Sequence, residues 1–334
     1  MALRLLEMVL QEKDCGGVHT LLEKCNVLEH RQIRLVGGEV LVRILLDAEQ
    51  SETVMDLLEK RYTGAQGNRV VILPVEATLP RAQAEPEAAS EQSAPDENSP
   101  ERIGREELYE DIKNGARLSR VYMAMAVLST VVAAIGLHQN NAAVIIGAMV
   151  IAPLLGPNVA MSLGTTLGDL SLLRHGFVTA LSGIAVVFAL SVIIGVLLNV
   201  DPASSEMVSR TWVSFGDIAV ALASGSAGAL AFTTGVSATL IGVMVAVALL
   251  PPLVTSGLLL GGGHPALATG AVSLFLVNLI CINLAGVTTF LLQGIKPTSW
   301  WEKDRAVKAT RIAIALSVAL LAVLVGIIMV VRNS

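Results

Sequence analysis

The sequence predicts a multi-pass α-helical membrane protein with a small α+β domain at its N-terminus. Of its 334 residues, 53% are hydrophobic and only 15% are charged, whereas soluble domains carry about 25% charged residues. The acids and bases are concentrated before residue 118 and are rare between 118 and 331. We therefore expect a water-soluble part, 1–78, and a transmembrane part, 118–331.

The first 78 residues show the β-α-β-β-α-β order of a ferredoxin-like domain. Apolar and β-branched patterns predict strands at 2–10, 30–36, 40–47 and 69–75, and helices at 15–27 and 52–62. Gly37 and Gly38 indicate a hairpin turn between the middle strands, and Ser51 stands where it would cap the second helix. The domain shows no phosphate loop and no catalytic cluster, so we expect a regulatory or assembly role, or a passive cap.

Two short segments connect this domain to the apolar part. Residues 79–100 are rich in Ala, Glu, Pro and Ser and have little to bury, which predicts a disordered acidic linker. Residues 101–117 predict an amphipathic helix with Ile103, Leu108 and Ile112 on its apolar side. We expect this helix at the cytoplasmic face of the membrane.

Seven apolar segments follow, and a span needs about 20 apolar residues. The segments are 118–137, 141–168, 173–199, 216–232, 236–262, 266–293 and 309–331. The fourth is short and built of small residues, so it could also be re-entrant. With seven spans and the N-terminus inside, only Arg210 and Arg332 among the flanking basic residues lie outside. The charges therefore predict a protein of the cell (plasma or inner) membrane with a cytoplasmic N-terminal domain and an external C-terminus.

The second and fifth segments resemble each other. IGAMVIAPLLGP at 146–157 and IGVMVAVALLPP at 241–252 align with an offset of 95 residues. The same offset superimposes a three-span unit, 118–199, on a second unit, 213–294. Three spans are an odd number, so the second unit would enter from the opposite side and form an inverted repeat, with 309–331 as an extra helix.

Inverted repeats with interrupted helices are typical of secondary transporters, which bind their substrates at the interruptions. Proline removes a helical hydrogen bond, so we expect both matching helices to break near the membrane centre. The alternative is a pair of packing kinks without a ligand. The residues proposed to bind a substrate are Gly147, Pro153, Gly156, Pro157, Asn158, Thr165, Thr234, Gly242, Pro251, Pro252, Thr255, Asn278 and Asn283.

Other site classes find no support in the sequence. The middle of each predicted span lacks charged residues, and Cys15, Cys25 and Cys281 show neither zinc-like nor redox spacing. We expect no catalytic residues, no metal site and no cofactor. No basic block suggests nucleic-acid binding.

Four stretches resemble a known family. These are IGAMVIAPLLGP (146–157), SGSAGALAFTTG (224–235), GVMVAVALLPPLV (242–254) and LFLVNLICINLAGV (274–287). They are similar to the hydrophobic membrane proteins of the domain of unknown function 389 family over about 119–295. The resemblance implies the membrane architecture but no activity, substrate or functional residues.

Two functions follow as hypotheses. The first is a transporter or channel for a small solute or ion, with a cytosolic regulatory or assembly domain. The alternative is a membrane-anchored sensor or scaffold whose soluble domain binds a ligand or partner. The expected partners are the lipid bilayer, an unknown small solute or ion, and a second copy in a homo-oligomer. An enzyme is disfavoured because no catalytic cluster is visible.

Overall fold

A computed structural model describes most of the chain. The described residues are 3–22, 25, 27–63, 69–75, 104–198, 200–234, 238–295 and the single positions 314, 315, 319 and 326. The chain divides into two compact units, Met1–Leu108 and Tyr109–Ser334. The predicted linker 79–100 lies outside the described residues, and so does the predicted last span 309–331 apart from four single positions.

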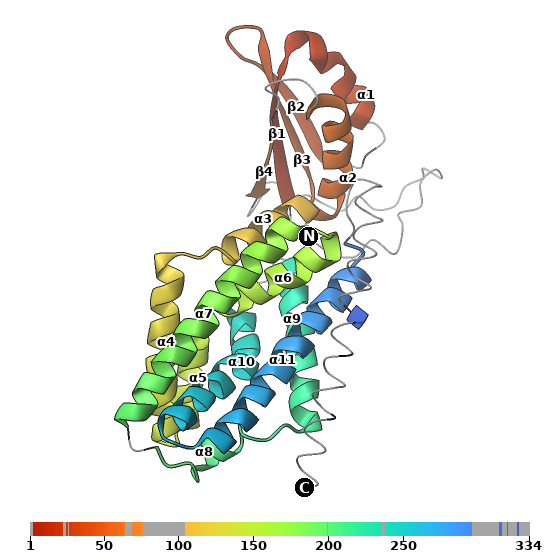
Figure 1. Cartoon of the computed structure of the whole chain (residues 1–334). Coiled ribbons are helices and arrows are strands. Elements are labelled where there is room, and N and C mark those ends of the chain that lie inside the picture. Colours follow the sequence, from red (N-terminus) through yellow and green to blue (C-terminus); the bar gives the residue numbers. More distant parts are fainter. Residues whose placement is uncertain are drawn as a thin grey trace. The chain divides into compact units, whose positions relative to one another are not determined.

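The N-terminal unit contains one four-stranded antiparallel sheet. Its strands are β1 (Leu3–Gln11), β2 (Glu29–Arg34), β3 (Glu39–Asp47) and β4 (Val70–Val75), in the order β2-β3-β1-β4. Helices α1 (Val18–Leu22) and α2 (Ala48–Leu58) lie along one face of the sheet (Figure 1). The element order β-α-β-β-α-β is therefore confirmed.

The core of this unit follows from strand alternation. Every second residue of β1 and β3 is buried, and the buried set includes Leu6, Met8 and Val42. Gly37 and Gly38, in the turn between β2 and β3, have φ values of 101° and 80°, a region that glycine enters at little cost. The predicted hairpin turn is thus confirmed.

The predicted start of the second helix is wrong. Helix α2 begins at Ala48, directly after Asp47, which has the extended backbone of an N-terminal flanking residue. Ser51 lies inside the helix, is buried, and donates its hydroxyl to the carbonyl of Ala48. Both Asp47 and Ser51 are residue types that favour helix starts, and the helix starts after the earlier of the two, whose side chain makes no cap hydrogen bond.

Helix α3 (Arg105–Gly115) covers most of the predicted amphipathic segment. Its first turn belongs to the N-terminal unit, where Arg4 Nε donates to Glu107 Oε2 at 2.7 Å. Arg105 lies 3.3 Å from Asp56 Oδ1, with only 8% of its surface exposed. Buried cations of this kind need such partners, because desolvation is costly.

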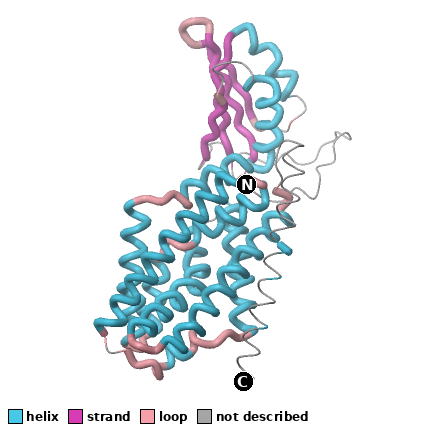
Figure 2. The backbone as a smooth tube through the Cα atoms, in the orientation of Figure 1, coloured by secondary structure: helices cyan, strands magenta, loops and turns pink. Residues whose placement is uncertain are grey.

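In its described residues the second unit consists of helices joined by loops and turns, without strands (Figure 2). Its helices are α4 (Arg120–His138), α5 (Ala142–Ile151), α6 (Leu155–Leu167), α7 (Leu170–Leu197), α8 (Ser205–Val208), α9 (Phe215–Thr234), α10 (Ala238–Gly261) and α11 (Pro265–Leu292). By length and composition, α4, α7, α9 and α11 can each cross a membrane, and the bent pair α5–α6 supplies a fifth candidate. This confirms a membrane protein with an N-terminal α+β domain. The count of seven spans and the repeat stay predictions.

The first predicted helix break is confirmed. Helices α5 and α6 are bent by 55° at residues 152–154. Ala152 has an extended backbone, with ψ of 124°, as expected for a residue that precedes proline. Pro153 therefore causes the break, whereas Pro157 falls in the first turn of α6, where a missing N–H costs little.

The second predicted break is wrong. Helix α10 runs without interruption from Ala238 to Gly261 and contains both Pro251 and Pro252. In the aligned segments Pro157 matches Pro252, but Pro153 matches Ala248. The second helix thus lacks the proline that breaks the first, and the neighbouring helix α11 binds one of the backbone groups that its prolines leave free.

Glycines allow the helices of this unit to approach closely. A Cβ atom added at Gly195 in α7 would lie 2.4 Å from the carbonyl oxygen of Leu258 in α10. One added at Gly225 in α9 would lie 2.6 Å from the carbonyl oxygen of Ile282 in α11. Small residues at contacts of this kind favour helix association in lipid. The hydrophobic effect does not drive helices together there, so close packing matters more.

Candidate functional site

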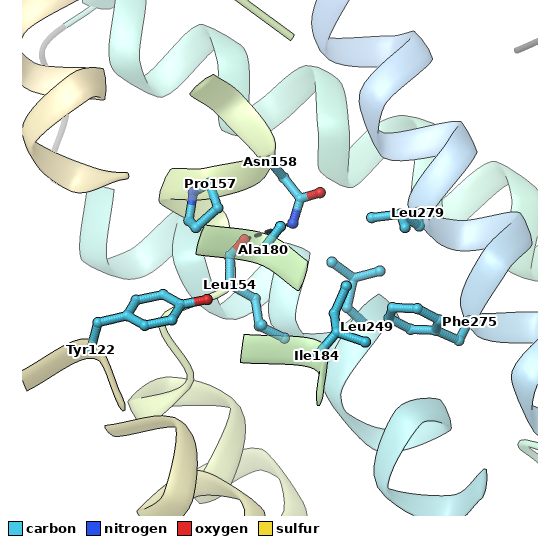
Figure 3. A pocket seen from close by; sticks show the side chains of 9 residues that line it. All are labelled: Tyr122, Leu154, Pro157, Asn158, Ala180, Ile184, Leu249, Phe275 and Leu279. Carbon is cyan, nitrogen blue, oxygen red and sulfur yellow. Dashed lines mark hydrogen bonds between the residues drawn. The ribbon is translucent and has the colours of Figure 1, made fainter. Parts of the chain in front are cut away.

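A small cavity lies where the broken helix meets α4, α7, α10 and α11 (Figure 3). Its lining consists of Tyr122, Leu154, Pro157, Asn158, Ala180, Ile184, Leu249, Phe275 and Leu279. The space open to the centre of a water molecule is about 10 Å³, which is room for about one water. The cavity therefore joins the first break to the helix that carries the matching prolines.

Tyr122 and Asn158 supply the polar side chains of this lining. Tyr122 is 5% exposed and its hydroxyl donates to the carbonyl of Thr179 at 3.2 Å. Gly183 makes room for this ring, because a Cβ there would lie 2.3 Å from the phenol oxygen. Tyr122 is thus held in place by α7, on the side of the cavity formed by the first break.

Asn158 connects the broken helix to α11. Its side-chain N–H donates to the carbonyl of Leu154 at 2.7 Å, which is the bond drawn in Figure 3. Its side-chain oxygen accepts a hydrogen bond from Asn283 Nδ2 at 3.2 Å. Asn283 Nδ2 also donates to the carbonyl of Leu279. The two predicted asparagines are therefore brought together, although 125 residues separate them.

Ser162 lies between these asparagines, and our site prediction missed it. Its hydroxyl oxygen lies 3.1 Å from the carbonyl oxygen of Asn158, 3.3 Å from the carbonyl oxygen of Asn283 and 3.4 Å from Asn283 Oδ1. We call these four oxygens the oxygen cluster. Ser162 is four residues after Asn158 on α6, and this spacing is the signal that could have identified it. Gly286 faces Ser162 and lets α11 approach.

Asn278 lies on α11, in the sequence between two residues that line the cavity, Phe275 and Leu279. It is 4% exposed, and its Nδ2 donates to the carbonyl of Ala248 at 2.7 Å. Among the described residues, its Oδ1 has no hydrogen-bond partner. Thr255 Oγ1, further along α10, is likewise buried without a partner there. A buried acceptor without a donor is costly.

The remaining predicted site residues do not line this cavity. Gly147 faces open space, and Thr234 is exposed and donates to its own helix. Thr165 donates to the carbonyl of Met161, and Gly156 packs against the backbone of Gly115. Pro153 is half-buried in the break, Gly242 lies within α10, and Pro251, Pro252 and Thr255 are buried in α10.

The site carries no formal charge. In the described parts of the apolar helices, charged residues lie only near the ends, such as Arg174 near the start of α7 and Asp217 in the first turn of α9. The described residues contain no group of three His, Cys, Asp or Glu side chains that could hold a metal ion. Amides, hydroxyls and backbone dipoles are therefore the groups available to a ligand at the cavity.

The last part of α3 attaches to the helices that form the break. The Tyr109 hydroxyl donates to Asp169 Oδ2 at 2.7 Å. Burial, and then this bond to the carboxylate, raise the pKa of Tyr109 to about 12, so the phenol remains a donor at neutral pH. Asp169 Oδ1 also accepts hydrogen bonds from the first N–H groups of α7, those of Ser171 and Leu172.

The comparisons with known proteins give a family match and an uncharacterised relative. The family model described as "Domain of unknown function (DUF389)" matches residues 149–284, which contain the break, the oxygen cluster and Asn278. A protein of Methanocaldococcus jannaschii described as uncharacterised is 37% identical over 320 residues, covering 96% of this chain and 97% of its own length. No solved structure matches the chain.

Proposed function

Since the chain belongs to the DUF389 family, whose description names no activity, we propose from its own geometry that it is a transporter or channel for a small solute or ion. The observation that carries this proposal is the polar cluster of Asn158, Ser162 and Asn283 beside a cavity at a broken apolar helix. Neutral polar groups inside a membrane protein are expensive unless they bind one another or a substrate.

Placement of the polar groups supports transport over simple anchoring. An anchor helix is most stable when it is apolar and continuous. Here a helix is broken by 55°, and three neutral polar side chains converge within two turns of the break. Broken helices that line a cavity are the usual binding elements of secondary transporters.

The cavity admits about one water molecule, so we propose that the structure represents a closed conformation. Opening would require movement around the break, because Pro157, Asn158 and Leu154 form one side of the cavity and Phe275 and Leu279 of α11 form another. Residues 152–154 separate the two helices, and Ala152 there has an extended backbone, so we propose that they form the hinge.

We propose the finer topology on the same basis. Seven spans, with 309–331 as the last, place the N-terminal domain in the cytoplasm and the C-terminus outside the plasma or inner membrane. In an inverted repeat, α4, α5–α6 and α7 correspond to α9, α10 and α11. The packing of α7 on α10 and of α11 on α6 supports this correspondence, because each third helix then contacts the second helix of the other unit.

The N-terminal domain would regulate or assemble the membrane part. Helix α3 supports this role, because it is one continuous helix whose first turn pairs with Arg4 and Asp56 and whose later residues include Tyr109. A ligand or partner of the N-terminal domain could act through this helix on Asp169, at the start of α7. The alternative function is a membrane anchor whose soluble domain is the sensor. It is favoured by the small size of the cavity, which has room for about one water molecule and not for a larger solute.

Solute flux separates these functions. The full chain is reconstituted into liposomes and tested against a panel of small ions and neutral metabolites, with protein-free liposomes as the control. We expect flux of at least one solute class, and we expect it to persist when residues 1–103 are removed. Absence of flux for every class, together with loss of all cellular function on that deletion, would favour the sensor.

A further inference from the structure

We propose that the oxygen cluster binds a dehydrated monovalent cation of about the size of sodium. This inference rests on the proposed function, because it names the class of ion that the site takes. The cluster consists of Ser162 Oγ, the carbonyl oxygens of Asn158 and Asn283, and Asn283 Oδ1. Asn158 and Ser162 are 3% and 2% exposed.

The spacing of these oxygens fits ligands of an ion better than hydrogen-bonded partners. Hydrogen bonds between two oxygens are usually about 2.7–2.8 Å long, whereas the three distances to Ser162 Oγ are 3.1, 3.3 and 3.4 Å. Calcium, which has nearly the radius of sodium, is bound by oxygens at about 2.3–2.6 Å. Two such ligands at right angles lie about 3.2–3.7 Å apart by the same geometry, close to the spacing observed.

The balance of donors and acceptors gives the sign of the ligand's charge. One hydroxyl proton of Ser162 faces three acceptor oxygens, and it can satisfy only one of them well. The two backbone carbonyls already accept N–H bonds within α6 and α11, but each has a second lone pair. A cation can bind these free lone pairs, whereas an anion would add another acceptor.

The chemistry of the ligands gives the valence. Sites for divalent cations are usually built with carboxylates, and no acidic side chain belongs to the oxygen cluster. The nearest acidic residue along α6 and α7 is Asp169, which is engaged by Tyr109 and by the start of α7. Amide, hydroxyl and carbonyl oxygens can replace the weaker hydration shell of a monovalent ion, and unwound or half-helix carbonyls do so in transporters.

The neighbouring cavity completes the site. Asn158 belongs both to the cluster and to the cavity lining, and the cavity holds about one water molecule. A cation at the cluster could therefore keep one water as a further ligand. A path for the hydrated ion would open only when the break moves.

Thermal unfolding of the full-length protein in detergent tests this site. Sodium chloride is titrated against choline chloride at constant ionic strength, because choline is too large for the cluster. A ligand that binds only the folded state raises the unfolding temperature in a saturable way. We expect such a rise with sodium, and a rise of different midpoint with lithium and potassium.

Matched variants assign the effect to the cluster. Ser162→Ala should weaken sodium binding at least about tenfold, the order expected for loss of one contact to a charge. The control is Ser129→Ala, because Ser129 is equally buried but its hydroxyl donates only to its own helix, to Ala126. Asn283→Asp keeps the shape, adds a carboxylate, and should strengthen sodium binding and admit calcium. This variant keeps the test decisive if Ser162→Ala fails to fold.

The outcomes separate this inference from the proposed function. Identical unfolding in sodium and choline chloride, or equal sodium shifts in Ser162→Ala and Ser129→Ala, would overturn the cation site. Flux of a neutral solute that ignores sodium in the liposome assay would also overturn it, while the transport function stands. Saturable sodium binding that is lost in Ser162→Ala supports the site even if no flux is found.

Discussion

The side-chain amide of Asn278 donates to the carbonyl of Ala248 at 2.7 Å, and Ala248 is the residue whose intrahelical donor is missing at Pro252. Proline has no N–H to bond the carbonyl four residues before it. Asn278, on α11, supplies the missing donor from another helix. This contact replaces the hydrogen bond that Pro252 removes from α10, which runs on to Gly261.

Asn278→Leu should therefore lower the free energy of unfolding by about 1–3 kcal/mol, the cost of leaving a buried carbonyl without a donor. Pro252→Ala restores the N–H within α10. In the double variant, Asn278→Leu should then cost much less, and a double-mutant cycle measures the difference. Equal costs in the two backgrounds would show that Asn278 stabilises the protein in another way.

Pro153→Ala should straighten the bend between α5 and α6, because it removes the restriction on Ala152 that breaks the helix. Spin labels are attached at the exposed positions Ala143 and Leu170. The distance between them, measured by pulsed electron paramagnetic resonance, should become longer. Pro157→Ala is the matched control and should leave the distance unchanged, because Pro157 lies in the first turn of α6. An unaltered distance in Pro153→Ala would assign the break to another residue.

Gly195→Ala should destabilise the protein by about 1–3 kcal/mol, because the new methyl group would meet the backbone of α10. Gly147→Ala provides the control, since nothing lies within 4 Å of a Cβ there. At that helical position alanine is expected to stabilise by up to about 1 kcal/mol. Thermal unfolding of the two variants should give shifts of opposite sign, and shifts of the same sign would contradict the close α7–α10 contact.

Because of the bond between Tyr109 and Asp169, the free energy of unfolding should change with pH in the alkaline range. The pKa of Tyr109 is raised from 10 to about 12 in the folded protein. A raised pKa means that the folded state holds the proton more tightly, so this contribution is complete below pH 10 and is lost as the pH rises through 12. Tyr109→Phe should unfold at a lower temperature than the wild type at neutral pH. The gap should narrow from pH 10 to pH 12, whereas a constant gap would contradict the assignment.

The sequence predicted those elements whose signals are local. Strand alternation and the Gly37–Gly38 turn sufficed for the sheet, and the dipeptide Ala152–Pro153 sufficed for the first break. The prediction of a second break was wrong. The carbonyl of Ala248, which Pro252 leaves without a helical donor, is bonded by Asn278, thirty residues further along the chain. A proline signals that a backbone donor is missing, but only the packed structure shows whether a neighbour replaces it.

The candidate site was predicted in part for a similar reason. Asn283 was identified because an asparagine in an apolar run needs a partner, and Asn158 because it flanks the first break. Each proved to be a partner of the other. Gly147 and Thr234 were included by their position near the matching segments, but the structure places both away from the cavity. These helices are apolar on every side, so hydrophobic periodicity could not show which face turns toward the bundle. Ser162 flanks the same break but was not among the predicted site residues, and a hydroxyl inside a helix usually bonds its own backbone.

Flux through reconstituted protein carrying Asn158→Leu tests the central claim most directly. Asn158 joins the break, the cavity and the oxygen cluster, and leucine preserves its size but removes its polar groups. We expect wild-type protein and the Ser129→Ala control to move a small ion or solute at equal rates, and Asn158→Leu at least about tenfold more slowly, the effect of losing one contact to a charged or strongly polar substrate. Equal flux in the folded Asn158→Leu variant, or no flux in the wild type for any solute, would contradict the account.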